Sequence, residues 1–297
     1  MMRSYIAGLV MALVFGLSFL AEKAALDIFS ECSMLAWRFV IAALILYISR
    51  KIGLIRVELR NKPWYKLVAI SLLYPVLSFA LEAKGVGILP SSQAGVIMSL
   101  VPVIASMISA VFLGEHPVKE QIFMIFLSVI GVILITVGTN DIGQTRNIKG
   151  IWIMLCCACC VAVQTVLVRK QSRCFSSIEI TYVMNFTAAI IFNIILGVCN
   201  GRNIIRNHWL PFATWEGAIS ILYLSVGCSI IAFFALNYVN AHLEVARASV
   251  FVNLSTVVSM ISGILWGNES AVLSQWIGMI CIVIGVWGVN HFKSVHS

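Results

Sequence analysis

The sequence predicts an all-α polytopic membrane protein with ten transmembrane helices in two inverted five-helix repeats. Three observations lead to this fold class: a very apolar composition, ten apolar segments of membrane-spanning length, and an internal repeat of half the chain. Hydrophobic residues make up 61% of the 297 residues, charged residues make up 11%, and the mean hydropathy is +1.00. A single soluble core cannot bury so much apolar surface, so a bilayer must act as the solvent.

The ten apolar segments each have roughly 17–23 residues, which is enough to cross about 30 Å of hydrocarbon. The first segment follows Arg3 as a signal peptide would, but its apolar run is too long and it has a counterpart in the second half. The connections 50–64 and 200–215 are of loop length, which leaves no room for a soluble domain. The expected spans are 4–21, 32–49, 65–83, 91–113, 120–138, 150–168, 179–199, 216–236, 246–266 and 273–291.

The repeat is clearest where an apolar run ends on a carboxylate. The stretch "LVPVIASMISAVFLGEHP" occupies 100–117, and "LSTVVSMISGILWGNES" occupies 254–270. Pairing Glu115 with Glu269 needs an offset of 154, whereas pairing the two "SMIS" stretches needs 153, so the local register is open by one residue. Because each half holds an odd number of spans, the second half starts on the opposite side of the membrane. Residues 1–140 and 148–293 are therefore predicted to be inverted repeats.

The basic residues predict the orientation of the chain. If both termini are cytoplasmic, most Lys and Arg lie on the cytoplasmic side, as the positive-inside rule requires. The loops on the other side then hold only Lys23, Lys84, Arg146, Lys149, Arg202 and Arg206. The net charge of +8 is thus explained by topology, and we expect no nucleic-acid partner.

Cysteine usage and the absence of motifs argue against an enzyme. Cys156, Cys157, Cys159 and Cys160 lie inside an apolar span. A soft-metal site on one helical face stays open there, but cysteine also serves as a small apolar residue that lets helices approach closely. The sequence has no Walker loop, HExxH, GxSxG or dinucleotide motif, and its five histidines are scattered over loops and ends. We expect no enzymatic activity, no metal and no cofactor.

Several stretches resemble the EamA repeat of the drug/metabolite transporter superfamily. They are the Gly-Glu pair that ends the fourth segment, "FGLSFLAEKAAL" in the first, "LAWRFVIAALIL" in the second, "FMIFLSVIGVILITVG" in the fifth and "LNYVNAHLEVARASVFVNL" before and into the ninth. The resemblance covers both halves and implies ten helices around a central cavity and alternating access, commonly for efflux of amino acids, metabolites or drugs. The chain departs from the family pattern at Glu22, Glu82 and Lys84, which leaves the substrate open.

Ionisable residues inside the predicted spans are candidates for the site, because such groups are costly in a bilayer unless they are paired or line a wet cavity. Arg38 is either an anion-binding group for a carboxylate substrate or a structural partner of Glu22 or Glu31. Glu82, at the end of the third segment, is either a proton-coupling carboxylate or a local partner of Lys84.

Neutral polar and aromatic residues complete the predicted site. A buried amide needs a partner, and aromatic rings form apolar or cation–π walls, although helix packing is the alternative role for each of them. Pro102 is the expected hinge, with a static kink as the alternative. The candidate substrate-binding residues are Phe15, Ser18, Arg38, Tyr74, Glu82, Ser99, Gln164, Tyr182, Asn185, Asn237 and Asn253.

The sequence therefore predicts an inner-membrane secondary transporter that exports a small metabolite such as an amino acid. Its expected partners are the small-molecule substrate, the lipid bilayer and protons as a candidate coupling ion. A monomer suffices, because one chain contains both halves. Import of a metabolite on the same fold and a membrane accessory or sensor subunit without transport remain alternatives. An intramembrane enzyme would need a nucleophile and base at membrane depth, and the sequence offers none.

Overall fold

The computed structural model describes residues 2–26, 28–88, 97–137, 148–200, 214–266 and 272–292, and these residues form helices joined by short turns. In chain order the helices are α1 (Met2–Leu26), α2 (Glu31–Lys51), α3 (Tyr65–Ser71), the π-helical η1 (Leu72–Leu77), α4 (Ser78–Ile88), α6 (Val101–Phe112), α7 (Lys119–Val137), α8 (Ile148–Gln171), α9 (Ser177–Asn200), α11 (Trp215–Leu222), the π-helical η5 (Tyr223–Ala232), α12 (Phe233–His242), α13 (Val245–Ser249), α14 (Phe251–Trp266) and α15 (Leu273–His291).

The apolar helices make the chain a multi-pass membrane protein. Seven helices of the described part are long and apolar enough to cross a bilayer: Glu31–Lys51, Tyr65–Glu82, Ile148–Gln171, Ser177–Val198, Trp215–His242, Val245–Ser262 and Leu273–His291. Met2–Ser18 and Val101–Phe112 are shorter apolar helices. Part of the predicted span 91–113 lies outside the described residues, as does Glu269.

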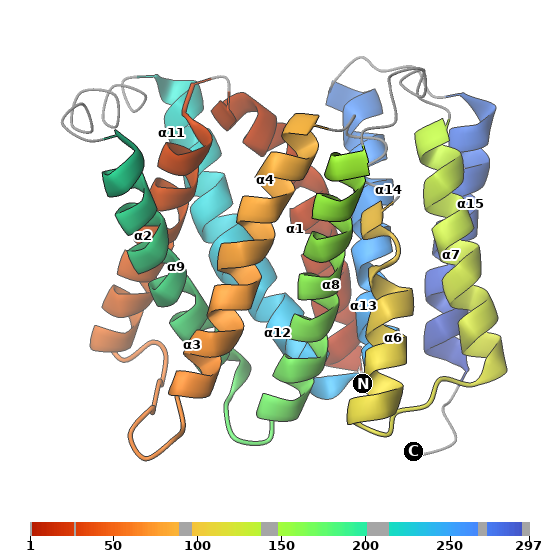
Figure 1. Cartoon of the computed structure of the whole chain (residues 1–297), viewed down its shortest axis with the longest axis horizontal. Coiled ribbons are helices and arrows are strands. Elements are labelled where there is room, and N and C mark those ends of the chain that lie inside the picture. Colours follow the sequence, from red (N-terminus) through yellow and green to blue (C-terminus); the bar gives the residue numbers. More distant parts are fainter. Residues whose placement is uncertain are drawn as a thin grey trace.

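The helices run up and down across the bundle in Figure 1. α1, α3 to α4, α7, α9 and α13 to α14 run upward, and the helices between them run downward, so α1 begins and α15 ends at the lower end of the view. The main packing pairs are α7 with α15, α2 with α9, α1 with α14, α4 with α8, and α6 with α8. All five of these pairs join a helix before residue 140 to one after it, so the two halves form one bundle.

Two long helical segments contain a π-helical stretch near their middle. In the first, η1 contains Pro75, which has no amide hydrogen to donate, and the backbone at Tyr74 is extended, with φ −144° and ψ 119°. In the second, η5 joins α11 to α12 without a proline. Such stretches commonly mark functional sites in helices.

Pro102 lies in the first turn of α6, after a turn at Ser99 and Leu100. A proline there costs no helical hydrogen bond, because the first amides of a helix have no partner within it. The helix therefore begins at Val101, directly before Pro102, and does not bend at the proline. Its role as a hinge stays a prediction.

α7 and α15 approach closely because glycines face each other. A Cβ atom built on Gly131 would lie 2.6 Å from the carbonyl oxygen of Gly278, and one on Gly278 would lie 2.5 Å from that of Gly131. A Cβ on Gly285 would lie 2.8 Å from the carbonyl oxygen of Met124. Small residues let membrane helices pack backbone to backbone, as Gly131, Gly278 and Gly285 do here.

Candidate functional site

A cavity of about 370 Å³ lies among helices of both halves of the chain. This volume falls within the range of small-molecule sites in proteins. α1, α2, η1, α4 and residues 98–99 form one part of the wall, and α8, α12, α13 and α14 form the rest. The lining residues are Phe15, Ser18, Glu22, Arg38, Tyr74, Phe79, Glu82, Met98, Ser99, Met154, Val161, Thr165, Leu236, Asn240, Ala248, Ser249, Val252, Asn253, Ser255, Thr256 and Ser259.

One wall of the cavity is aromatic. Phe15, Tyr74 and Phe79 each pack against the fully buried Phe233, with ring centroids 6.2, 5.6 and 6.3 Å from its ring. Phe39 lies on the far side of this group, 6.1 Å from Phe233. These contacts fix the ring positions, so the cavity offers a preformed apolar surface.

Arg38 is the basic residue of the cavity wall, and its side chain is almost fully buried, with 3% exposed. Its Nε donates a hydrogen bond of 2.8 Å to Ser229 Oγ, and its guanidinium lies 5.0 Å from the centroid of Phe79 and 5.6 Å from that of Phe39. A hydrogen bond and two cation–π contacts thus orient the planar cation.

Two carboxylates, Glu22 and Glu82, line the same cavity and are close enough to Arg38 to interact with it electrostatically. The sequence left open an ion pair of Arg38 with Glu22 or Glu31 and an ion pair of Glu82 with Lys84. None of these forms among the described residues, whose ion pairs join Lys62 to Glu179, Arg169 to Glu115 and Arg247 to Glu244. Both carboxylates are therefore available to a ligand.

Hydroxyl and amide groups supply the remaining polar surface. The predicted residues Ser18, Ser99 and Asn253 lie in the wall, and Asn253 Nδ2 donates to Ser128 Oγ at 3.0 Å. Asn240 also lies in the wall, 1% exposed, and neither atom of its amide has a hydrogen-bond partner.

Three predicted amides lie outside the cavity wall and connect buried helices instead. Gln164 Nε2 donates to Asn237 Oδ1 at 3.5 Å, and Asn237 Nδ2 donates to Thr181 Oγ1 at 3.0 Å. Asn185 Nδ2 donates to the carbonyl oxygens of Thr181 and Ser229, at 2.9 and 2.8 Å. Since Ser229 also accepts the bond from Arg38, the amide of Asn185 supports the cavity from behind.

Tyr182 also lies away from the cavity. Its ring stacks on Phe186 with centroids 4.4 Å apart and packs with Leu46 and Val57 in a separate apolar cluster. The packing role, which the sequence left as the alternative, is the one that this geometry favours.

The sequence reasoning missed several wall residues, although some of them carry a readable pattern. Glu22 follows Phe15 and Ser18 at helical spacing, and Thr256 and Ser259 continue the face of Asn253. Such polar stripes through apolar helices indicate a wet cavity. The remaining wall residues not proposed from the sequence include Thr165, Asn240, Ser249 and Ser255.

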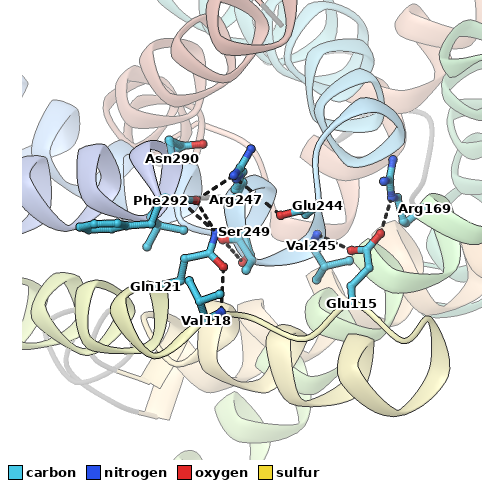
Figure 2. A network of polar contacts seen from close by, with 12 residues as sticks. Glu115, Val118, Gln121, Arg169, Glu244, Val245, Arg247, Ser249, Asn290 and Phe292 are labelled. Atoms are coloured by element: carbon cyan, nitrogen blue, oxygen red, sulfur yellow. Dashed lines mark hydrogen bonds and ion pairs between the residues drawn. The ribbon is translucent and has the colours of Figure 1, made fainter. Parts of the chain in front are cut away.

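A polar network, which we call the latch, joins the helix ends at the lower end of the bundle in Figure 1, and Figure 2 shows it from close by. The carboxylate of Glu115, in the loop before α7, accepts 2.9 Å bonds from Arg169 Nε and from the amide of Val245. Arg169 Nη1 also donates to the carbonyl oxygen of Ala241 at 2.6 Å. Glu115 therefore joins the first half of the chain to the second.

The other part of the latch holds the end of α15. The carbonyl oxygen of Phe292 accepts from Arg247 Nη2 at 2.7 Å and from Gln121 Nε2 at 3.1 Å. Gln121 Oε1 accepts from the amide of Val118 at 3.2 Å, and Arg247 Nε lies 3.5 Å from Glu244 Oε2. The latch thus ties α7, α8, α13 and α15 together at one end.

The model of the EamA-like transporter family matches residues 2–137 and again residues 148–291. The chain belongs to the EamA-like transporter family. The resemblance noted in the sequence is thereby confirmed, and membership implies a small-molecule substrate and a lipid environment.

Relatives of this EamA-like protein align over nearly its whole length. It is 33% identical over 288 residues to the uncharacterized transporter YcxC of Bacillus subtilis, covering 97% of this chain and 92% of YcxC. It is 24% identical over 276 residues to a Streptantibioticus cattleyicolor protein named "probable terminal-alkyne amino-acid exporter", covering 92% of this chain and 88% of that protein. A protein of known crystal structure matches with a TM-score of 0.81 and 16% identity, covering 97% of this chain and 96% of its own, which shows the shared fold alone.

Proposed function

We propose that this EamA-like protein is a secondary transporter that exports a small amphipathic metabolite, such as an amino acid, by alternating access. The observation that carries the proposal is the composition of the cavity, in which one guanidinium, two carboxylates and an aromatic wall lie together between the two halves. No ATP-binding loop accompanies it in the sequence.

The cavity matches the groups of a zwitterion. A substrate carboxylate fits the guanidinium of Arg38, an ammonium group fits Glu22 or Glu82, and an apolar side chain fits the wall of Phe15 and Tyr74. The name of the Streptantibioticus relative, an amino-acid exporter, supports this substrate class and the export direction.

Ten membrane-spanning segments in two inverted halves are part of the proposal. The alternating helix directions in Figure 1 support it, because α1 runs upward and α8, which begins the second half, runs downward. The packing also supports it, since exchanging the halves turns the α1–α14 contact into the α8–α6 contact. The π-helical stretches η1 and η5 likewise lie in the third long segment of each half.

Protons are the proposed coupling ion. Two carboxylates and one guanidinium give the cavity a net charge of −1 when all three are ionised, and a zwitterion leaves that charge unchanged. A proton on Glu82 or Glu22 would neutralise the loaded cavity. Exchange of that proton between the two sides would then couple transport to the proton gradient.

The latch is the proposed gate of the transporter. We place the protein in the inner membrane with both termini, and therefore the latch, on the cytoplasmic side. Its bonds join loops and helix ends rather than helix middles, so they can break without unfolding a helix. Rocking of the two halves would open the latch and close the opposite side.

The first test is the thermal stability of the purified protein in detergent against amino acids, nucleosides, polyamines and cationic dyes. A ligand at 100 times its Kd adds about 2.7 kcal/mol to the folded state. We expect amino acids to stabilise the protein and then to exchange in proteoliposomes, with faster movement in the export direction. Folded protein that responds to no compound would contradict the proposal and favour the accessory-subunit alternative.

A further inference from the structure

Asn240 is a buried amide with unused hydrogen-bonding capacity. Its side chain is 1% exposed, and neither Nδ2 nor Oδ1 has a hydrogen-bond partner. The other amides of the described residues with a buried unpartnered atom are Gln164, Asn185 and Asn290, and each of them still donates at least one hydrogen bond. An amide that is buried with no partner at all is destabilising, so a structural role does not account for it.

Asn240 is one of the residues that line the cavity. Thr165 of α8 and Ser249 of α13 line the cavity too, on helices that pack against α12. Their hydroxyls already donate to carbonyl oxygens of their own segments, Thr165 to Val161 at 3.0 Å and Ser249 to Ala246 at 3.3 Å. Asn240 is therefore the wall residue of this region that has both a free donor and a free acceptor.

Asn240 and the charged residues line the same cavity from different helices. Glu22 belongs to α1, Arg38 to α2 and Glu82 to α4, whereas Asn240 lies two residues before the end of α12. A charged ligand group suits Arg38 or the carboxylates, and a neutral polar group suits the amide of Asn240.

We propose that Asn240 recognises a neutral donor–acceptor group at the end of the substrate's side chain, and that the substrate is an amino acid bearing a carboxamide. A carboxamide presents one N–H and one C=O side by side, so it can form two hydrogen bonds with the amide of Asn240 at once. The inference rests on the proposed function, because it concerns the molecule held in the same cavity, and it adds the chemistry of the side chain.

The test uses two pairs of amino acids that differ mainly in the amide: L-glutamine with L-norleucine, and L-asparagine with L-leucine. Affinity is measured by thermal stabilisation of the full-length protein and by counterflow in proteoliposomes. We expect the wild type to bind the amide member of each pair about tenfold more tightly. Asn240→Leu should lose this preference, whereas the ligand-free variant should unfold at the same or a higher temperature.

Two further variants separate recognition from folding. Asn193→Leu is the matched control, because Asn193 Nδ2 donates to the carbonyl oxygen of Ala189 at 2.7 Å and lies outside the cavity wall; it should keep the preference. Asn240→Asp keeps the volume and the acceptor but removes the donor, so it should also lose the preference. It therefore tests the inference even if Asn240→Leu fails to fold.

The outcomes distinguish this inference from the proposed function. If the wild type moves leucine and norleucine as well as their amide partners, the transporter proposal stands and the role of Asn240 is refuted. If Asn240→Leu unfolds at a markedly lower temperature and Asn240→Asp keeps the preference, Asn240 is structural. If none of the four amino acids binds, the carboxamide inference and the amino-acid proposal both fail.

Discussion

The latch and the cavity use polar residues in opposite ways. In the latch, Glu115 and Arg169 bond to each other, and each also bonds to a backbone group of the α12–α13 region. In the cavity, Glu22 and Glu82 form none of the ion pairs found among the described residues, and the amide of Asn240 has no hydrogen-bond partner.

The difference teaches which polar groups serve the fold and which remain for a ligand. A buried polar group without a partner lowers stability, so its persistence indicates another use. A satisfied network holds helix ends in one arrangement. We therefore expect substitutions in the cavity to change transport far more than stability, and substitutions in the latch to change the balance between conformations.

The largest effect is expected at Arg38. Arg38→Ala removes the basic group of the cavity wall, so an anionic substrate group loses charge-assisted bonds, and counterflow should fall about 100-fold. Arg38→Lys should recover little, because an ammonium group lacks the planar geometry that contacts Phe79 and Ser229 together. Arg50→Ala is the control, since Arg50 is exposed and lies over Tyr182, outside the cavity. Full transport by folded Arg38→Ala would show that the guanidinium is structural.

A smaller and more selective effect is expected at Glu82. Glu82→Gln keeps the shape of the side chain but cannot gain or lose a proton, so accumulation driven by a pH gradient should drop about tenfold while counterflow continues. Glu22→Gln tests the second carboxylate in the same assay, and Glu120→Gln controls for the loss of an exposed acid in α7. Gradient-driven accumulation that persists in both cavity variants would refute proton coupling through these residues.

The predicted apolar spans agree with the helices at most positions, because membrane length and apolar composition constrain where a helix can lie. Their ends were less accurate, and Glu22 shows the consequence. The first span was expected to stop at residue 21, which left Glu22 just outside it. α1 continues to Leu26, so Glu22 lies within the helix and lines the cavity.

The rotation of a helix was harder to predict than its position. Gln164 and Thr165 are neighbours in an apolar segment, but Thr165 lines the cavity while Gln164 bonds to Asn237. Successive residues of a helix point about 100° apart, and only the partners on other helices decide which one faces the cavity. Asn240 was missed for the same reason, because its lack of partners is a property of the packed bundle.

The smallest effect is expected at the latch, where Glu115→Ala leaves Arg169 and the amide of Val245 without their shared acceptor. Both side chains of this ion pair are about a quarter exposed, 26% and 24%, so solvent screens it and the loss should be about 1 kcal/mol. That corresponds to about a fivefold shift toward the state in which the latch is open. A Ser255→Cys reporter, placed in the cavity wall, should then react about fivefold faster with a maleimide added at the latch side, once the labelling of the native cysteines is subtracted. Glu120→Ala, which removes an exposed acid nearby, should leave the labelling rate unchanged. Equal labelling of the Glu115 and Glu120 variants would mean that the bonds of Glu115 only shape the loop, and the gate would have to be sought around Arg247 and Gln121, which hold the end of α15.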